Sequence, residues 1–393
     1  MNINLPYGKD KTELKISGDS RVHTVKTPII KPKKSSKNLV EEAIENPIGK
    51  KSLSQIIEEK DKENLKAVII IDDKTRACPD EMLAPILVKR LIDCGVNEKQ
   101  ITIIVATGLH KPPSKSEIVE LAGGEKIPGG VNLVGHDAVR SDFVNVGEVN
   151  DKYEVEINKI VVEADLKIST GFIEPHFFAG FSGGRKSVLP GVASKSTILN
   201  NHSYNNIKNE NASSGILSGN PVHEEATEGA ELTGLDFILN VVLNGNQEII
   251  HAVAGDFKEA FNYGVELGFD ICSIKLEKNY EAVLTTNSGY PLDQDLYQTV
   301  KGMYTASLAA KNGAPIIVTA ECSEGLGPDN FTKLNKNHST PHDVLEYIRK
   351  NGPVIAQWEN QVMCEILKNH KVYLNSSLNT KEVEKMMLNP VED

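Results

Sequence analysis

Short apolar runs and helical patterns alternate along most of the chain. The runs AVIII at 67–71 and ITIIV at 101–105 are continuous and rich in β-branched residues, which is typical of strands buried on both faces of a sheet. Between them, residues 80–95 space their apolar side chains like a helix and end at Gly95. This alternation predicts an α/β fold with mainly parallel sheets.

The same alternation continues to the end of the chain and divides it in two. Alternating apolar positions near Ile3 and near Leu14 predict strands at the start. Further strands are expected at 166–170, 237–245, 282–286 and 315–319, a long helix at 296–313, and helix starts at the capping sequences 114–117 and 340–343. The pattern restarts after about residue 270. We therefore expect two α/β domains, residues 1–270 and 271–393, with the active site in the cleft between them.

Composition and charge narrow the class of protein. The chain has 393 residues, of which 39% are apolar and 25% charged, so it holds enough apolar material for two globular cores. Its formal net charge of −11 argues against a nucleic-acid partner, because attraction to phosphates needs a basic surface. Positive clusters therefore stand out against an acidic background.

Cysteine usage and the absence of long apolar runs predict a cytoplasmic protein. The N-terminus has no apolar stretch of signal-peptide length, and no run of 18 apolar residues occurs, so no membrane partner is expected. The five cysteines are odd in number and show no CxxC pair, which favours reduced thiols. They are Cys78, Cys94, Cys272, Cys322 and Cys364.

Two polar loops follow predicted strands, where open parallel sheets bind ligands. The loop IDDKTRACP carries Asp72, Asp73 and Arg76, and an arginine there can grip a carboxylate with two hydrogen bonds. An exposed Arg–Asp pair in a capping loop is an equally ordinary interpretation. The loop ATGLHKPPS presents His110 beside Lys111, although a lone histidine is more often structural.

The third loop, GFIEPHFFAGFSGGRKSVLPG at 171–191, combines glycines with a histidine and two cations. Gly183 and Gly184, like Gly180, allow close approach of a ligand to the backbone. Arg185 and Lys186 then stand at a predicted helix start, which favours a bound anion. A nucleotide-binding P-loop is excluded, because it needs lysine directly after the second glycine and Arg185 intervenes.

These loops resemble those of a known family, the nickel-pincer nucleotide-dependent lactate racemases and their 2-hydroxy-acid racemase and epimerase relatives. The resemblance is carried by DDKTRACP, TGLHKPP, the whole third loop, STILNNH, GNPVHE and YPLDQDLYQTVKGM. It runs in order from LPYG near the N-terminus to at least Trp358. The family has more chain after the region matching EVEKMMLNPVED, so this sequence departs from it there.

The resemblance implies a cofactor and a set of residues around it. The cofactor is a nickel-pincer nucleotide, pyridinium-3-thioamide-5-thiocarboxylic acid mononucleotide, joined covalently to Lys186, with His202 as the protein ligand of Ni(II). An imidazole suits a square-planar nickel site. Other residues implied to bind this cofactor are Asp73, Thr75, Gly184, Arg185 and Trp358. Residues 1–270 would form the cofactor-binding catalytic domain.

The resemblance also implies a reaction and its groups. His110 and His176 would act as acid and base, and the substrate pocket would comprise Arg76, Tyr297, Gln298 and Lys301, three of them from residues 271–393. A 2-hydroxy acid of the lactate type would be racemised by proton-coupled hydride transfer to the pyridinium, through a bound 2-keto acid. Maturation enzymes that build the cofactor are the implied partners.

Other interpretations remain open from the residues themselves. Tyr297, Gln298 and Lys301 could form an ordinary solvated helix face. The protein could be a non-catalytic carrier or sensor that binds a nickel cofactor or a hydroxy acid, although a carrier needs no pair of bases. It could also run a dehydrogenase-like reaction with the same cofactor, or be a simple metallohydrolase.

Overall fold

A computed structural model describes residues 2–16, 20–26 and 29–391 and divides the chain into two compact units. The large unit comprises residues 26–201 and 209–273, and the small unit residues 1–25, 202–208 and 274–393. The chain passes into the small unit after Ser273, close to the expected boundary at 270. The small unit also includes residues 1–25 and 202–208, which precede this boundary in the chain. They belong to it because they pack with elements formed by residues after 274.

The large unit is built on a six-stranded sheet with the order β12-β11-β8-β3-β4-β5. Neighbouring strands run parallel except β12, which is antiparallel to β11. The strands are β3 (Ala67–Asp72), β4 (Ile101–Ala106), β5 (Asn132–Gly135), β8 (Leu166–Phe172), β11 (Phe237–Leu243) and β12 (Ile249–Gly255). The predicted α/β class with mainly parallel sheets is confirmed.

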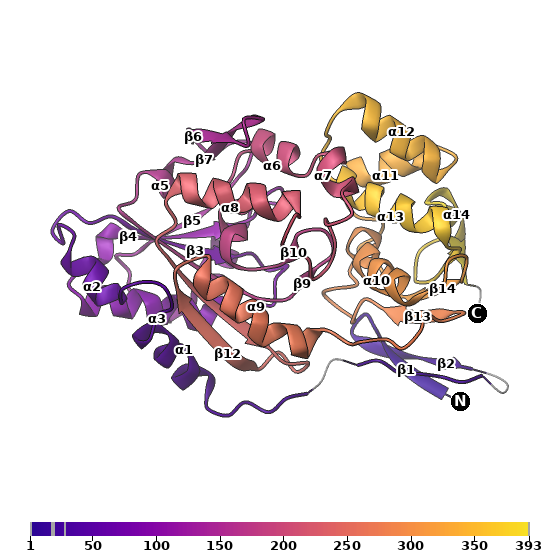
Figure 1. The fold of residues 1–393 in the computed structure, drawn as a ribbon, viewed down its shortest axis with the longest axis horizontal. Helices are drawn as coiled ribbons and strands as arrows, with labels where there is room; N and C mark the ends of the chain where they lie inside the picture. Colours follow the sequence, from indigo (N-terminus) through magenta and orange to yellow (C-terminus); the bar gives the residue numbers. More distant parts are fainter. Residues whose placement is uncertain (1, 17–19, 27–28, 392–393) are drawn as a thin grey trace. The chain divides into compact units, whose positions relative to one another are not determined.

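Helices cover both faces of this sheet (Figure 1). Ile69 and Ile71 of β3 face one apolar cluster, and Val68 and Ile70 face the other, as the alternation of side chains along a strand requires. The first cluster includes residues of α1 (Ser36–Glu45), α2 (Leu53–Glu58), α3 (Asp80–Asp93) and α4 (Lys115–Ala122). The second includes residues of α5 (Lys159–Val162), α6 (Lys195–Asn201), α8 (Pro221–Thr233) and α9 (Glu259–Cys272).

Short elements complete the large unit. Two antiparallel pairs lie outside the main sheet, β6 (Phe143–Val149) with β7 (Tyr153–Asn158) and β9 (Pro175–His176) with β10 (Gly180–Phe181). Three 3-10 helices are η1 (Glu98–Gln100), η2 (Gly124–Lys126) and η3 (Gly184–Ser187).

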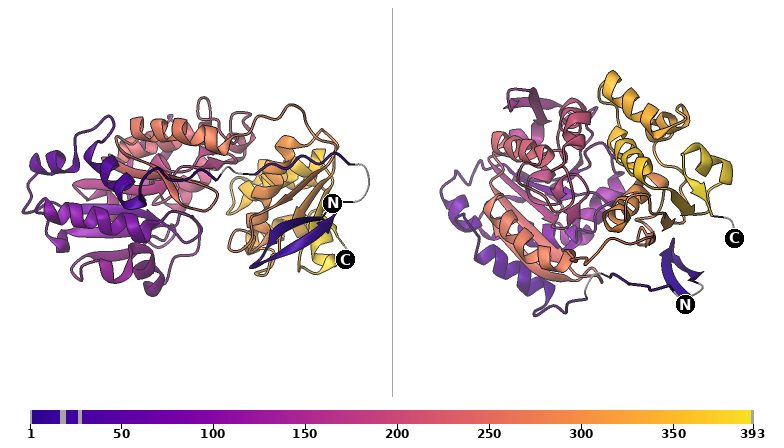
Figure 2. Two further views of the ribbon diagram at one scale, coloured as in Figure 1. Left: turned by 90° about the horizontal axis from the view of Figure 1, so that it is seen from below. Right: turned by 45° about the vertical axis from the view of Figure 1, so that its right-hand side comes forward.

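The small unit has a four-stranded parallel sheet and an N-terminal hairpin (Figure 2). Its strands are β13 (Val283–Thr286), β14 (Ile316–Thr319), β15 (Val372–Asn375) and β16 (Asn389–Pro390), and the hairpin joins β1 (Asn2–Tyr7) to β2 (Asp10–Lys15). Its helices are α7 (Tyr204–Lys208), α10 (Leu296–Ala309), α11 (Asp329–Lys336), α12 (Pro341–Asn351), α13 (Gln357–Asn369) and α14 (Thr380–Lys385). Asp293 fixes the hairpin, because its Oδ2 accepts from Gly8 N at 2.7 Å and from Glu321 N at 3.1 Å.

Most predicted elements are confirmed, and one is wrong. The strands and long helices lie where the patterns placed them, and Ser114 forms the expected capping box with Glu117. No regular helix starts at Arg185 and Lys186, where the chain makes only the four-residue turn η3. Pro190 and Gly191 come after two further residues, and the next helix begins at Lys195.

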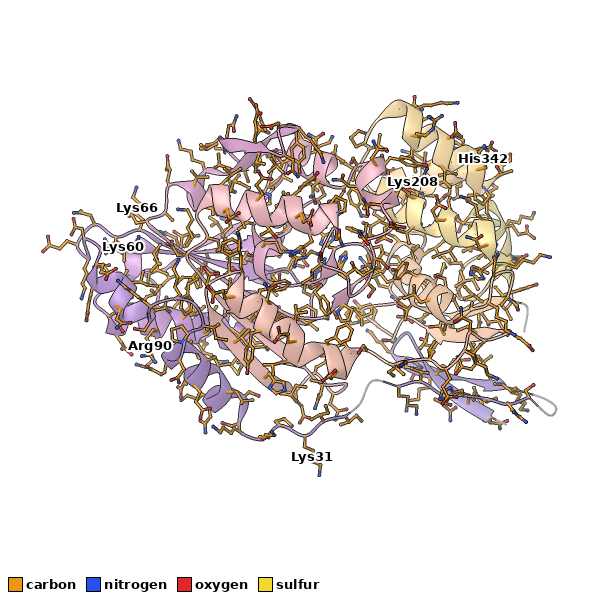
Figure 3. All side chains as sticks on the ribbon, in the orientation of Figure 1. Lys31, Lys60, Lys66, Arg90, Lys208 and His342 are labelled. Carbon is orange, nitrogen blue, oxygen red and sulfur yellow. The ribbon has the colours of Figure 1, made fainter. Side chains whose placement is uncertain are left out.

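None of the described helices is both long and apolar enough to span a bilayer. Lys60 and Lys66 project from the large unit near the amino end of β3, the opposite edge of the sheet from the three polar loops (Figure 3). All five cysteines are free thiols.

Candidate active site

The three loops singled out in the sequence lie at one edge of the main sheet. They follow β3, β4 and β8, which are neighbours in the order β8-β3-β4 and run parallel. The chain continues from β3 to β4 on one side and from β8 to β11 on the other, and open parallel sheets commonly bind ligands where the strand order reverses in this way. The fold therefore gathers the candidate residues of the large unit at this carboxyl edge.

Asp73 and His110 form a close pair between the first two loops. Asp73 Oδ2 lies 2.6 Å from His110 Nδ1, and the Asp73 side chain is 9% exposed. Burial by itself would raise the pKa of Asp73, but His110, Arg76 and Thr75 outweigh it and hold this pKa well below its usual range. Asp73 is therefore an anion at neutral pH, and its hydrogen bond orients the imidazole.

Thr75 connects this pair to Arg76. Its hydroxyl donates to Asp73 Oδ1 at 2.5 Å, and its backbone N–H donates to the same oxygen at 2.8 Å. Arg76 Nη1 donates to Thr75 Oγ1 at 3.1 Å. A partly buried guanidinium is thus held beside the imidazole, at a position from which it can bind a carboxylate.

His176 is held differently from His110. Its Nδ1 accepts from Ala179 N at 3.2 Å, and its ring stacks on Phe177 with centroids 4.8 Å apart. Phe178 packs edge-on against the same ring at 4.6 Å. An Nδ1 that accepts a hydrogen bond belongs to an imidazole whose proton is on Nε2. His110 is thus oriented by a carboxylate and His176 by a backbone N–H.

The glycine-rich turn before Lys186 is tightly packed. Gly183 and Gly184 have φ values of +86° and +56°, a region that side chains disfavour. Arg185 is buried, and its guanidinium donates to the carbonyls of Gly183 at 3.2 Å and Ala179 at 2.7 Å. The arginine thus supports the turn. Lys186 is half-buried, and its positive charge acts to lower the pKa of Asp72.

Next to the first loop lies a pair of carboxyl groups, the half-buried Asp72 and the buried Asp80. Asp72 N donates to Asp80 Oδ2 at 3.0 Å, and one ligand atom each of Asp72, Asp80 and Cys78 lie within 4.8 Å of one another. Burial, with the neighbouring Asp72 charge, raises the pKa of Asp80 to about 8. Burial also raises the pKa of Asp72, to about 6, although Arg76 and Lys186 oppose this. Asp80 is therefore a neutral acid at pH 7.

Replacing Asp80 with asparagine is expected to flatten the dependence of stability on pH. A pKa raised in the folded state gives stability that is complete below about pH 4 and is lost as pH rises through about 8. The asparagine keeps the acceptor for Asp72 N and has no proton to lose. Chemical denaturation at pH 5 and pH 9 should show a loss about 1–3 kcal/mol smaller in the variant than in the parent. Equal losses in both proteins would contradict a protonated Asp80.

In the small unit, His202, Trp358 and Tyr297 form a connected group. His202 is 6% exposed and lies edge-on to Trp358, with ring centroids 5.1 Å apart. Trp358 Nε1 donates to Tyr297 Oη at 3.0 Å, and Gln357 Nε2 donates to the carbonyl of His202 at 3.4 Å. The segment that carries His202 is therefore held by helix α13.

The remaining predicted substrate residues lie on the first turns of α10. Gln298 N donates to the N-cap Asp295 at 2.7 Å, and Lys301 Nζ donates to Gln298 Oε1 at 2.7 Å. The amide and the ammonium are thus paired on one side of the helix. The expected set falls on two units: Asp73, Thr75, Arg76, His110, His176, Gly184, Arg185 and Lys186 on the large unit, and His202, Tyr297, Gln298, Lys301 and Trp358 on the small one.

One buried polar residue at the site was missed in the sequence. Asn240 lies in the otherwise apolar strand FILNVVL and accepts from Gly184 N at 2.8 Å. An amide in the middle of a continuous apolar run was the available signal, because such a residue needs a hydrogen-bond partner.

Two family models match the chain. Residues 7–215 match the lactate racemase N-terminal domain, and residues 276–393 match the lactate racemase C-terminal domain. Among curated proteins, lactate racemase from Thermoanaerobacterium thermosaccharolyticum is 39% identical over 400 residues, covering 100% of this chain and 92% of that protein. Lactate racemase from Lactiplantibacillus plantarum is 37% identical over 383 residues, covering 96% of this chain and 88% of that protein.

Solved structures agree with these matches. The lactate racemase apoprotein from Thermoanaerobacterium thermosaccharolyticum superposes with a TM-score of 0.90 at 38% identity, covering 100% of this chain and 93% of that chain. A Thermotoga maritima protein superposes with a TM-score of 0.71 at 19% identity, covering 90% and 91%, which shows the fold alone.

Proposed function

Because the chain belongs to the lactate racemase family, we propose that it is an isomerase that interconverts the enantiomers of a small 2-hydroxy acid of the lactate type. The observation that carries this proposal is the 2.6 Å contact between Asp73 Oδ2 and His110 Nδ1, at the carboxyl edge of the sheet and next to Arg76. It supplies an oriented proton acceptor beside a group that can bind a carboxylate.

The two histidines would handle the hydroxyl proton of the two enantiomers. With Asp73 at Nδ1, neutral His110 exposes the lone pair of Nε2 and can take a hydroxyl proton, and the resulting imidazolium is stabilised by the carboxylate. His176 would serve the other enantiomer. Each conversion needs one histidine to receive a proton and the other to release one.

Arg76 and Lys301 would hold the substrate carboxylate. A guanidinium binds a carboxylate with two parallel hydrogen bonds, which keeps the reacting carbon at a fixed place through both halves of the reaction. The hydrogen bonds that Arg76 makes to Thr75 restrict where this guanidinium can lie. Tyr297 and Gln298 would line the remainder of the substrate pocket.

The residues fit the nickel-pincer nucleotide that the family resemblance implies. Lys186 offers an amine at the end of a packed glycine turn, and His202 offers an imidazole, a ligand suited to Ni(II). Trp358, beside His202, would pack near the cofactor, and Thr75, Gly184 and Arg185 would shape its surroundings. When bound, the pyridinium would supply a reversible acceptor for the hydrogen at C2 of the substrate.

A carrier or sensor remains the alternative, and the Asp73–His110 pair disfavours it. Cofactor binding alone gives no reason to hold an imidazole on a buried carboxylate. We also propose a cytoplasmic location, which the five free thiols support, and dependence on maturation enzymes that build the cofactor.

Racemisation of lactate in deuterated water tests the reaction type. We expect each enantiomer to be converted to the other with its original hydrogen kept at C2, because the histidines exchange only the hydroxyl proton. Mass spectrometry of the product, at early times, measures the label. Extensive deuterium at C2 would show carbanion chemistry, and absence of any racemisation by nickel-loaded protein would favour the carrier.

A further inference from the structure

Asn240 supports the turn from which Lys186 extends. It lies in the middle of β11 and is fully buried, at 0% exposed. In the sheet it is paired with Gly171 of β8 on one side and with Val253 of β12 on the other. An apolar side chain would be more stable at such a position, since a buried amide costs free energy that only hydrogen bonds offset.

The amide of Asn240 is only half satisfied. Its Oδ1 accepts from Gly184 N at 2.8 Å. Its Nδ2 has no hydrogen-bond partner among the described residues. A hydrogen bond left unmade in this way costs free energy, so the unpaired amide nitrogen destabilises the strand. What it contributes is the bond to the glycine turn.

The glycines around Asn240 bring the backbone of the turn against this amide. A Cβ added to Gly183 would lie 2.8 Å from Asn240 Oδ1, and one added to Gly171 would lie 3.1 Å from Asn240 Nδ2. Both distances are closer than ordinary van der Waals contact. The missing side chains therefore allow the amide to reach the turn.

Arg185 stabilises the same turn by donating hydrogen bonds to backbone carbonyl groups. Its guanidinium donates to Ala179 O and Gly183 O and lies over the ring of Phe261, 4.7 Å from the centroid. Asn240 accepts a hydrogen bond from the N–H of Gly184, the next residue, and Ser187 Oγ donates to Gly184 O at 3.0 Å. The backbone just before and after Lys186 is thus fixed from several directions.

We propose that Asn240 is a positioning residue for Lys186: its bond to Gly184 N sets the turn so that the lysine amine can attack the carbon of a thiocarboxylic acid group on a pyridinium nucleotide. In that attachment an N–C bond forms to give the thioamide, the C–O bond breaks, and the oxygen leaves as water with the protons of the amine. This rests on the proposed function, in which Lys186 is the attachment site. Bond formation depends on the placement of the reacting atoms, so a loosened turn lowers the rate of attachment. The role is distinct from binding, because Asn240 itself is buried in the sheet.

Two variants separate the hydrogen bond from the packing. Asn240→Leu removes the acceptor, and Asn240→Asp keeps an oxygen at Oδ1 and gives up only the nitrogen that has no partner. Asn335→Leu is the matched control, because Asn335 is also fully buried but lies on α11 of the small unit. If Asn240→Leu does not fold, Asn240→Thr, which is shorter and also unable to reach Gly184, takes its place.

The first measurements use protein without cofactor. Hydrogen exchange of the Gly184 amide should be about tenfold faster in Asn240→Leu, since one buried hydrogen bond is lost, and unchanged in Asn240→Asp and Asn335→Leu. Acetylation of Lys186 by acetic anhydride, relative to Lys195 in the same protein, should change by about threefold or more in Asn240→Leu alone. Unchanged exchange and unchanged acetylation in Asn240→Leu would overturn the proposal.

The last measurement is the fraction of chains that carry the adduct after expression in a host that builds the cofactor. Intact mass should show a loss of about tenfold or more in Asn240→Leu, recovery in Asn240→Asp and parent-like loading in Asn335→Leu. Full loading of Asn240→Leu would refute the role of Asn240. If the parent carries no adduct, the proposed function fails, and exchange and acetylation still decide whether Asn240 sets the turn.

Discussion

Replacing Lys186 with alanine is expected to leave a folded protein that carries no covalent cofactor and has no racemase activity above background. Lys186 is the amine at the end of the packed turn formed by Gly183 and Gly184. Its side chain is half-buried and is not part of an apolar core, so alanine should change the midpoint of thermal unfolding by no more than a few degrees. The reaction proposed here has no substitute for the bound group, so the loss should be complete.

Intact mass and nickel analysis measure this effect, on protein from a host that matures a known relative. The parent should show a mass increase and close to one nickel per chain, and both should disappear in Lys186→Ala. Lys195→Ala is the matched control, because Lys195 is exposed on the same segment at the start of α6 and should keep adduct, nickel and activity. An adduct that survives in Lys186→Ala would place the attachment at another residue.

The hydrophobic pattern was sufficient to predict the architecture, because apolar residues recur with different periods in strands and in helices. Ala67–Asp72 and Ile101–Ala106 are strands covered on both faces, and their apolar runs could be recognised without any tertiary information. Parallel strands also place their following loops at one edge, which is why the loops with Asp73, His110 and His176 could be grouped from the sequence. The helix expected at Arg185 does not form, because Pro190 and Gly191 follow soon after and prevent the turn from continuing as a helix.

The sequence could not reveal which polar atoms meet across the fold. Asn240 is 56 residues from Gly184, and Asp73 is 37 residues from His110, so neither hydrogen bond has a local signature. The same holds for the segment 202–208, which packs with helix α13 although residues of the large unit precede and follow it in the chain. The position of Arg185 at a predicted helix start suggested that it would face a bound anion, whereas its guanidinium donates to the carbonyls of Gly183 and Ala179. Such contacts depend on the path of the backbone, which the local pattern does not specify.

Replacing His110 with asparagine is expected to lower kcat/KM by roughly 10²–10⁴-fold, the usual contribution of a general acid or base. The equilibrium constant of a racemisation is one, so kcat/KM must fall by the same factor for both enantiomers. The individual kcat and KM values need not change equally for the two enantiomers, because His110 would serve one enantiomer as base and the other as acid. His342→Asn, an exposed histidine on α12, is the control and should keep full activity (Figure 3).

Asp73→Asn makes the same test more specific. The amide keeps the size of the side chain but removes the anion that lies 2.6 Å from His110 Nδ1. The carboxylate that orients the imidazole is then missing, so kcat/KM should fall for both enantiomers. Cofactor loading, measured by intact mass, should remain near that of the parent in both variants. Loss of the adduct would show that the pair holds the cofactor, and near-parent activity of His110→Asn would remove this histidine from the proton transfer.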